Sequence, residues 1–86
     1  MDENKKSYRE VIVYTRLHKG ITQAQMGEAL GVSQSYQAYI ENGSRYPNSN
    51  YLVTFLNVYG INLLNYDMAP ITEKEKSTKV SKSRVR

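Results

Sequence analysis

Hydrophobic residues recur at helical intervals along the chain, in segments separated by glycine or proline. The first such segment predicts a helix from Ser7 to Lys19. Gly20 follows its last turn, where a left-handed cap residue is favoured. The inward face of this helix is expected to carry Tyr8, Val11, Ile12 and Thr15.

Two further helices are predicted on either side of a three-residue turn. Thr22 and Gln25 have the capping-box spacing, so a second helix is expected to begin at Thr22. The turn is Gly31-Val32-Ser33, and Ser33 is the expected N-cap of a third helix that runs to Glu41 and stops at Asn42-Gly43. No long alternating run of apolar and polar residues indicates a strand.

The remaining apolar pattern predicts two more helices. The fourth follows Pro47, with Asn48 as its N-cap and Gly60 at its end, and the short fifth begins at Asn62. The expected inward stripe of the fourth is Tyr51, Leu52, Phe55, Leu56 and Tyr59, and the fifth is expected to carry Leu63, Leu64, Tyr66 and Met68.

Charge divides the 86 residues into two parts. Residues 1–70 carry six basic and six acidic side chains, whereas residues 71–86 carry six basic and two acidic ones. Residues 71–86 also lack the apolar content needed to offset the entropy of ordering. We therefore expect one folded domain, residues 1–70, followed by a disordered, flexible basic C-terminal tail, residues 71–86.

Several classes of function find no support in the composition. There is no cysteine and only one histidine, His18, and neither a phosphate-binding glycine loop nor a nucleophile with a base is apparent. We expect no enzyme activity, no metal, no cofactor and no small-molecule ligand. No apolar run approaches a membrane span and the first residues lack a signal-peptide pattern, so we expect a cytoplasmic, nucleoid-associated protein without a membrane partner.

Residues 23–42 fit a helix-turn-helix unit. Two helices that cross closely need a small residue at the crossing, which is Gly27, and the turn needs a positive backbone angle, which Gly31 allows. This arrangement holds the second helix of the unit clear of the body, where it can enter a major groove. The residues expected to pack the unit onto the rest of the chain are Met26, Leu30, Val32 and Ile40.

From about Ile12 to Leu64 the chain resembles the phage-repressor and Cro type (XRE-like) of helix-turn-helix domain. The resemblance implies an all-α, five-helix bundle that binds double-stranded DNA in a sequence-specific way and regulates transcription, most often as a dimeric repressor of a phage or mobile element. The matching stretches are Arg16 with Lys19-Gly20-Ile21-Thr22-Gln23, then Met26-Gly27 and Leu30-Gly31-Val32-Ser33-Gln34-Ser35, then Ile40-Glu41-Asn42-Gly43 and Pro47.

Two positions depart from the pattern of that family. Gln37 and Thr15 stand where the family usually has aliphatic residues. A buried Gln costs a few kcal/mol unless it is hydrogen-bonded. Either Gln37 finds a partner, for which Thr15 is a candidate, or the third helix is rotated or shortened.

The resemblance implies roles for residues in and around the third helix. The candidates for contacting bases are uncharged, and Gln34 is expected to bind an adenine. Gln23 is expected to bind a phosphate and to brace Gln34. For each contact the alternative is an ordinary surface or packing residue. The base-contacting set is Gln34, Ser35, Ala38 and Tyr39, and the phosphate-contacting set is Gln23, Ser33, Tyr36, Asn42, Ser44 and Arg45.

Other residues are expected to shape the protein or its assembly. The family often pairs an Arg with a Glu at the positions of Arg16 and Glu41, which implies a structural ion pair. Leu63, Leu64, Tyr66 and Met68 are the expected homodimer contact, which would set two recognition helices about 34 Å apart on an inverted-repeat operator. The alternative is that these four cover the protomer's own core. The basic tail either contacts phosphates or has no role.

A protein-interaction module is the competing hypothesis. In that case the helix-turn-helix fold would bind a protein, as an antitoxin-type partner does. Such a surface would expose more aliphatic or aromatic anchors than the third helix offers. Tyr36 and Tyr39 keep this alternative open.

Overall fold

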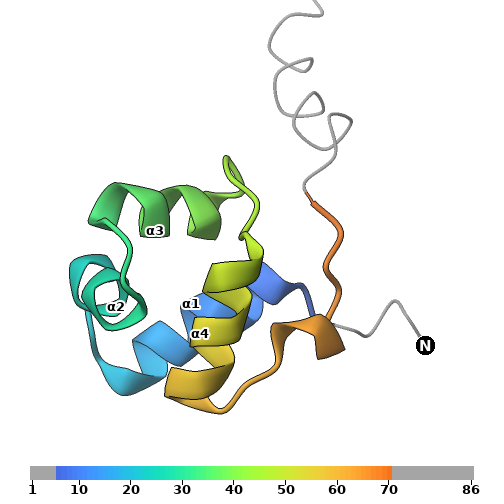
Figure 1. Cartoon of the computed structure of the whole chain (residues 1–86), viewed down its shortest axis with the longest axis horizontal. Coiled ribbons are helices and arrows are strands. Elements are labelled where there is room, and N and C mark those ends of the chain that lie inside the picture. The colour runs from blue at the N-terminus through green and yellow to red at the C-terminus, as the bar shows by residue number, and fades with distance from the viewer. Residues whose placement is uncertain (1–5, 71–86) are drawn as a thin grey trace, which may run out of the picture.

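The computed structural model describes residues 6–70, so the predicted tail at 71–86 lies outside the described residues. The described part is all-helical, apart from an isolated β-bridge between Ser7 and Asp67. Figure 1 shows α3 along one edge of the molecule, beside α2. The elements are α1 (Tyr8–Lys19), α2 (Gln23–Leu30), α3 (Gln34–Asn42), α4 (Ser49–Tyr59) and a short 3₁₀ helix, η2 (Leu63–Asn65).

The predicted N-caps Ser33 and Asn48 are present: the Ser33 hydroxyl and the Asn48 side chain each accept a hydrogen bond from a backbone N–H in the first turn of the following helix. Ser7, predicted as the first residue of α1, is instead its N-cap, and its hydroxyl accepts from the Arg9 N–H. Thr22 and Gln25 form both halves of the capping box. Because each cap satisfies a backbone donor that the helix leaves free, the beginnings of the helices are encoded locally.

The predicted fifth helix is wrong in extent. Its only helical part is the single turn of η2, and Tyr66 is already extended. The reason is a competing backbone pairing: Tyr8 N–H donates to Asp67 O at 2.9 Å, and Asp67 N–H donates to Lys6 O at 2.9 Å. These bonds tie the chain after η2 to the start of α1 and stop the helix from continuing.

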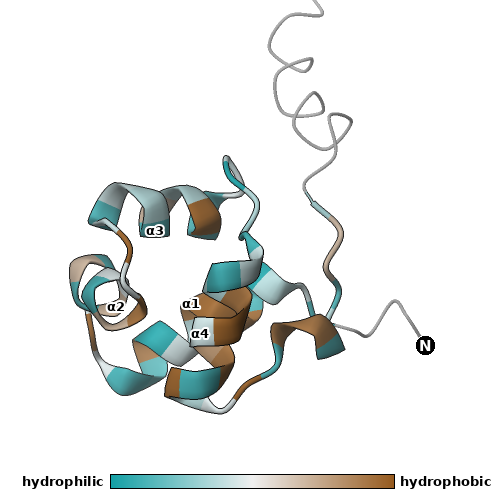
Figure 2. Ribbon diagram, in the orientation of Figure 1, coloured by the Kyte–Doolittle hydropathy of each residue, from teal (hydrophilic) through white to brown (hydrophobic). Residues whose placement is uncertain are grey.

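The core is built from the predicted inward faces of α1, α2, α3 and α4. Figure 2 shows α4 mostly in hydrophobic colours and α3 mostly in hydrophilic ones. Leu56 is a correction, because its side chain is 41% exposed; the inward stripe of α4 runs through Tyr51 and Phe55 instead. The buried hydrophobic residues are Tyr8, Val11, Ile12, Met26, Leu30, Ile40, Tyr51, Phe55 and Leu63.

None of the helices within residues 6–70 has the length and apolarity needed to cross a membrane.

Candidate nucleic-acid interface

A close crossing of α2 and α3 positions the candidate interface. The Val32 N–H donates to Gly27 O at 2.8 Å, and Gly31 adopts the left-handed conformation that the turn requires, with φ 77°. A Cβ at Gly27 would lie 2.8 Å from Val32 O and 3.1 Å from Ser33 O. Gly27 is therefore required by direct backbone packing.

The outer face of α3 carries the four predicted base-contacting residues. The side chains of Gln34, Ser35 and Tyr39 are exposed, and that of Ala38 is half-buried. On the opposite face of the same helix, Gln37 and Ile40 are fully buried. The exposed face presents amide, hydroxyl and phenol groups and no charge. These groups can donate and accept hydrogen bonds at base edges in a major groove.

Four of the predicted phosphate-contacting residues are exposed near the two ends of α3. Ser33 precedes the helix, and its hydroxyl accepts from the Tyr36 N–H at 3.0 Å. Asn42, Ser44 and Arg45 lie at the other end, where the Ser44 N–H donates to the Asn42 side chain at 2.8 Å. The Arg45 guanidinium lies over the Tyr39 ring, 5.8 Å from its centroid. This contact brings a cation to the exposed face.

Tyr36 and Gln23 are less free to contact a phosphate than the other four predicted residues, because each is already engaged within the protein. Tyr36 is half-buried, and its ring packs edge-on against Tyr51 with the centroids 6.2 Å apart. The side chain of Gln23 donates to Glu41 Oε1 at 3.1 Å. In this structure the Gln23 amide nitrogen thus bonds to the end of α3, and the brace to Gln34 stays a prediction.

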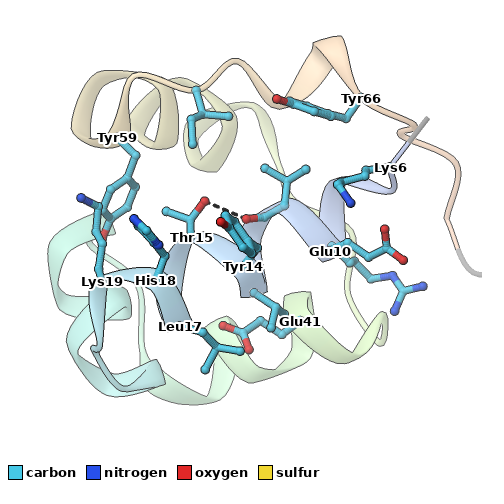
Figure 3. Close-up of a pocket in the computed structure, with 14 residues that line it drawn as sticks. Lys6, Glu10, Tyr14, Thr15, Leu17, His18, Lys19, Glu41, Tyr59 and Tyr66 are labelled. Atoms are coloured by element: carbon cyan, nitrogen blue, oxygen red, sulfur yellow. Dashed lines mark hydrogen bonds between the residues drawn. The ribbon is translucent and has the colours of Figure 1, made fainter. Parts of the chain in front are cut away.

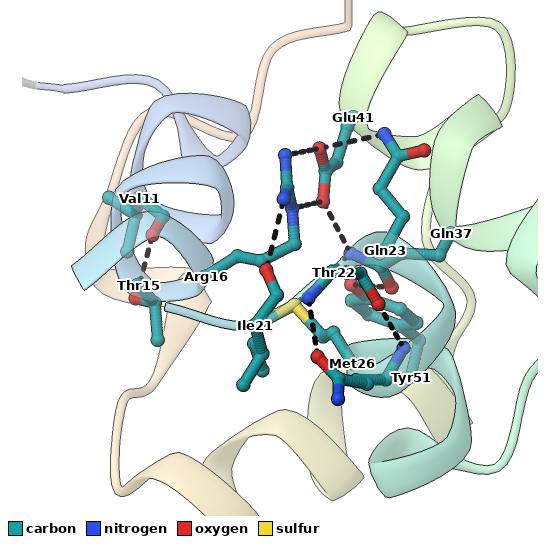
Figure 4. Close-up of polar contacts among 11 residues, drawn as sticks. Val11, Thr15, Arg16, Ile21, Thr22, Gln23, Met26, Gln37, Glu41 and Tyr51 are labelled. Atoms are coloured by element: carbon teal, nitrogen blue, oxygen red, sulfur yellow. Dashed lines mark hydrogen bonds and ion pairs between the residues drawn. The ribbon is translucent and has the colours of Figure 1, made fainter. Parts of the chain in front are cut away.

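Glu41 is the centre of a polar cluster that joins three helices (Figure 4). Its side chain is only 6% exposed and accepts two hydrogen bonds from Arg16 of α1, at 2.8 and 3.1 Å. It accepts another from Gln23 of α2 and another, at 2.9 Å, from Gln37 of α3 itself. The expected Arg16–Glu41 ion pair is thus present and has more partners than the sequence suggested.

Gln37 finds its main partner on α4. Its Oε1 accepts from the Tyr51 hydroxyl at 2.8 Å. The candidate partner Thr15 instead donates to Val11 O within α1, at 2.7 Å. Tyr51 was not predicted from the sequence as a polar partner of Gln37. Its place on the inward stripe of the fourth helix could have indicated the pairing, because a buried phenol requires a hydrogen bond just as a buried Gln does.

The environment of Glu41 favours its charged form. Burial raises the pKa of Glu41, but the hydrogen bonds from Arg16, Gln37 and Gln23, with the positive charge of Arg16, outweigh burial and hold the pKa below its usual value. Burial also raises the pKa of Tyr51 far enough that its hydroxyl keeps its proton. The two groups therefore have complementary roles, since one only accepts and the other donates.

This shift predicts a loss of stability in acid. As the pH falls below 4.5, the usual carboxyl value, the unfolded chain binds a proton at Glu41 before the folded chain does. We therefore compare the unfolding free energy of the wild type with that of Glu41→Gln. The excess in favour of the wild type is expected to be largest near neutral pH and to shrink between about pH 5 and pH 3. Urea unfolding across this range measures the excess. An excess that does not change with pH would contradict the assignment.

The residues predicted to form a dimer contact fall into three environments. Leu63 is 1% exposed and belongs to the protomer's own core, so its side chain is not available to a second chain. Tyr66 and Met68 are half-buried against the same core. Leu64, which is 61% exposed, is the one of the four that projects freely.

A groove of about 1080 Å³ lies along α1 and is separate from the outer face of α3. Figure 3 shows its lining, which includes Tyr14, Leu17 and His18 of α1 with Tyr59 and Tyr66. No predicted base-contacting residue lines this groove. Within residues 6–70, no group of three or more His, Asp or Glu side chains could hold a metal ion.

Comparison with known proteins agrees with this geometry. The helix-turn-helix family model matches residues 12–64, which is more than half of the 86-residue chain. Neither a curated protein nor a solved structure gives a significant match. The matched region contains the crossing at Gly27, the whole of α3 and the Glu41 cluster. The chain therefore belongs to the helix-turn-helix family, in its XRE/Cro type, and is a DNA-binding transcriptional regulator.

Proposed function

We propose that this regulator is a sequence-specific, dimeric repressor of the phage or mobile-element type that reads an inverted-repeat operator. The observation that carries the proposal is the division of α3 into two faces. Gln34, Ser35 and Tyr39 are exposed, while Gln37 and Ile40 are fully buried. An outward polar face on a helix held by a tight turn suits insertion into a major groove.

Base recognition in this proposal uses neutral groups. The Gln34 amide can bond to N6 and N7 of adenine, the Ser35 hydroxyl can bond to several bases, and the Ala38 methyl can contact a thymine methyl. Tyr39 lies on the same face, next to the Arg45 guanidinium. None of the four predicted base-contacting side chains is charged, so hydrogen bonding and shape, rather than an Arg–guanine pair, would be the source of specificity.

Phosphate contacts would fix the position of α3 in the groove. Exposed groups before and after the helix suit this role: the Ser33 hydroxyl, the Asn42–Ser44 turn and the Arg45 guanidinium. Gln23 is a weaker candidate because its amide N–H₂ already donates to Glu41. Tyr36 can contribute only its hydroxyl, since its ring packs against Tyr51.

Dimerisation would compensate for the small area of one module. Leu64 is the proposed anchor, with Tyr66 and Met68 at its border, whereas Leu63 acts from within the protomer. A two-fold pair would present two α3 helices to the same side of the duplex, about one helical turn, 34 Å, apart.

Selection of binding sites from random DNA tests the proposal, with Gln34→Ala as the diagnostic variant. We expect an inverted repeat with half-sites about one turn apart. Gln34→Ala should cost about 1–3 kcal/mol of binding free energy and relax the preference at one symmetric base pair. Asn57→Ala, which removes an exposed amide from α4, is the matched control and should leave affinity and preference unchanged.

Two results would count against the proposal. Enrichment of a single half-site would contradict binding as a dimer. No enrichment at any salt concentration would contradict sequence-specific recognition and would favour a protein partner.

A further inference from the structure

Gln37 is an unusual anchor for a short helix. α3 has nine residues, and only Gln37 and Ile40 among them are fully buried. Apolar contacts are non-directional, so Ile40 limits the rotation of α3 about its own axis less sharply than a hydrogen bond would. A buried amide differs in this respect, because its hydrogen bonds work only over a narrow range of distance and angle. At the last turn of the helix, Glu41 adds directional bonds to Arg16 and Gln23.

The Gln37 amide is fixed at both ends (Figure 4). Its oxygen accepts from Tyr51 Oη of α4 at 2.8 Å. Its nitrogen donates to Glu41 at 2.9 Å and lies 3.2 Å from the Met26 sulfur of α2. Turning the amide over would place its oxygen against the Glu41 carboxylate, where two acceptors would face each other. The bonding pattern therefore has one orientation.

Tyr51 is itself held rigidly. Its side chain is 1% exposed. Its ring stacks on Phe55 at a centroid distance of 6.0 Å and meets the edge of Tyr36 at 6.2 Å. The hydroxyl that meets Gln37 is thus positioned by aromatic packing in α4.

We propose that Gln37 and Tyr51 form a buried tether that sets the rotation of α3 and thereby the sequence preference of its exposed face. Both are positioning residues, because neither is exposed to DNA. The proposal rests on the function proposed above, since it assigns to the interior a part of the specificity of that surface.

Simple geometry gives the sensitivity of the tether. With side chains, a helix has a radius of about 5–6 Å, so a rotation of about 10° moves a side-chain tip by about 1 Å. Hydrogen bonds to base edges tolerate only about 0.5 Å of variation in length. A rotation of α3 that leaves the core intact would therefore be enough to disturb the contacts of Gln34 and Ser35.

The test removes both hydrogen-bonding groups and keeps the shape, with Gln37→Met and Tyr51→Phe combined in the full chain. Neither Gln37 nor Tyr51 is left without the other, and Glu41, which loses one donor, keeps its hydrogen bonds from Arg16 and Gln23. The equilibrium constant for unfolding should therefore stay within about tenfold of the wild-type value. Discrimination between the selected DNA site and sites with one changed base pair in the α3 contact region should fall by about tenfold. Affinity for non-specific DNA should not change.

The rotation itself has a readout that does not need DNA. Residual dipolar couplings of the backbone amides report the orientation of each helix in the free protein. In the double variant, the couplings of α3 should change or become averaged while those of α1 and α4 stay the same. Thr15→Val removes a buried hydroxyl that bonds within α1 and is the matched control, so neither readout should move.

The outcomes separate the two proposals. Unchanged α3 couplings in the double variant would overturn the tether, whatever happens to binding. Changed couplings with wild-type discrimination would overturn its link to specificity. If the wild-type protein shows no sequence preference, the proposed function fails together with the specificity role, while the couplings still decide whether Gln37 and Tyr51 fix α3.

Discussion

Gly27→Ala is expected to destabilise the fold and weaken DNA binding together. The added Cβ would lie 2.8 Å from Val32 O and 3.3 Å from Ser33 C, both backbone atoms of the turn. Such overpacking costs about 1–3 kcal/mol. For a domain of this size, each kcal/mol corresponds to a fall of about 4–8 °C in Tm. Thermal unfolding and a DNA titration measure the two effects.

The control for Gly27→Ala is the opposite substitution, Ala29→Gly, on the same helix. Ala normally stabilises a helix by about 1 kcal/mol relative to Gly. Ala29 is exposed on the same helix, so Ala29→Gly measures this preference without the backbone contact. If Gly27→Ala raised Tm by the amount that Ala29→Gly lowers it, α2 and α3 would not cross as described.

Glu41→Ala is expected to lower the unfolding free energy at least as much as Gly27→Ala does. It would leave the Arg16 guanidinium, 16% exposed, with only its bond to Ile21 O at 3.2 Å, and would remove the acceptor of Gln23 and Gln37. Removing one member of a buried pair costs about 3–5 kcal/mol. Because Arg16 retains some contact with solvent, we expect about 3 kcal/mol, measured by urea unfolding near neutral pH.

An exposed glutamate separates this effect from a general loss of charge. Glu28 is exposed on α2, and Glu28→Ala should change the unfolding free energy by no more than about 0.5 kcal/mol. Equal effects of the two substitutions would mean that the Glu41 cluster contributes nothing beyond surface electrostatics.

The parts of the fold that local chemistry determines were predictable. Each cap depends on residues within three positions of one another, as in the Thr22–Gln25 box. The close crossing at Gly27 and the turn at Gly31 also follow from what those positions require of a side chain. The outward face of α3 follows in turn, because the spacing of Ile40 and Gln37 leaves Gln34, Ser35 and Tyr39 on the other side.

The parts that depend on distant partners were not predictable. Tyr51 lies 14 residues from Gln37 and Gln23 lies 18 from Glu41, and nothing local says that these side chains meet. The end of the fifth helix was missed for the same reason, because the pairing of Asp67 with Lys6 and Tyr8 joins opposite ends of the domain. Leu63 and Leu64 are adjacent and chemically identical, so only the packed core distinguishes the buried one from the exposed one.

The most direct test of the central claim is a map of backbone amide shifts during titration with the selected DNA duplex. We expect the largest changes on α3 and the segments around it, from Ser33 to Tyr39 and from Asn42 to Arg45. The amides beside the α1 groove, at Tyr14, Leu17 and His18, should change little. Large changes along α1 with α3 unaffected would contradict the claim that the outer face of α3 meets DNA.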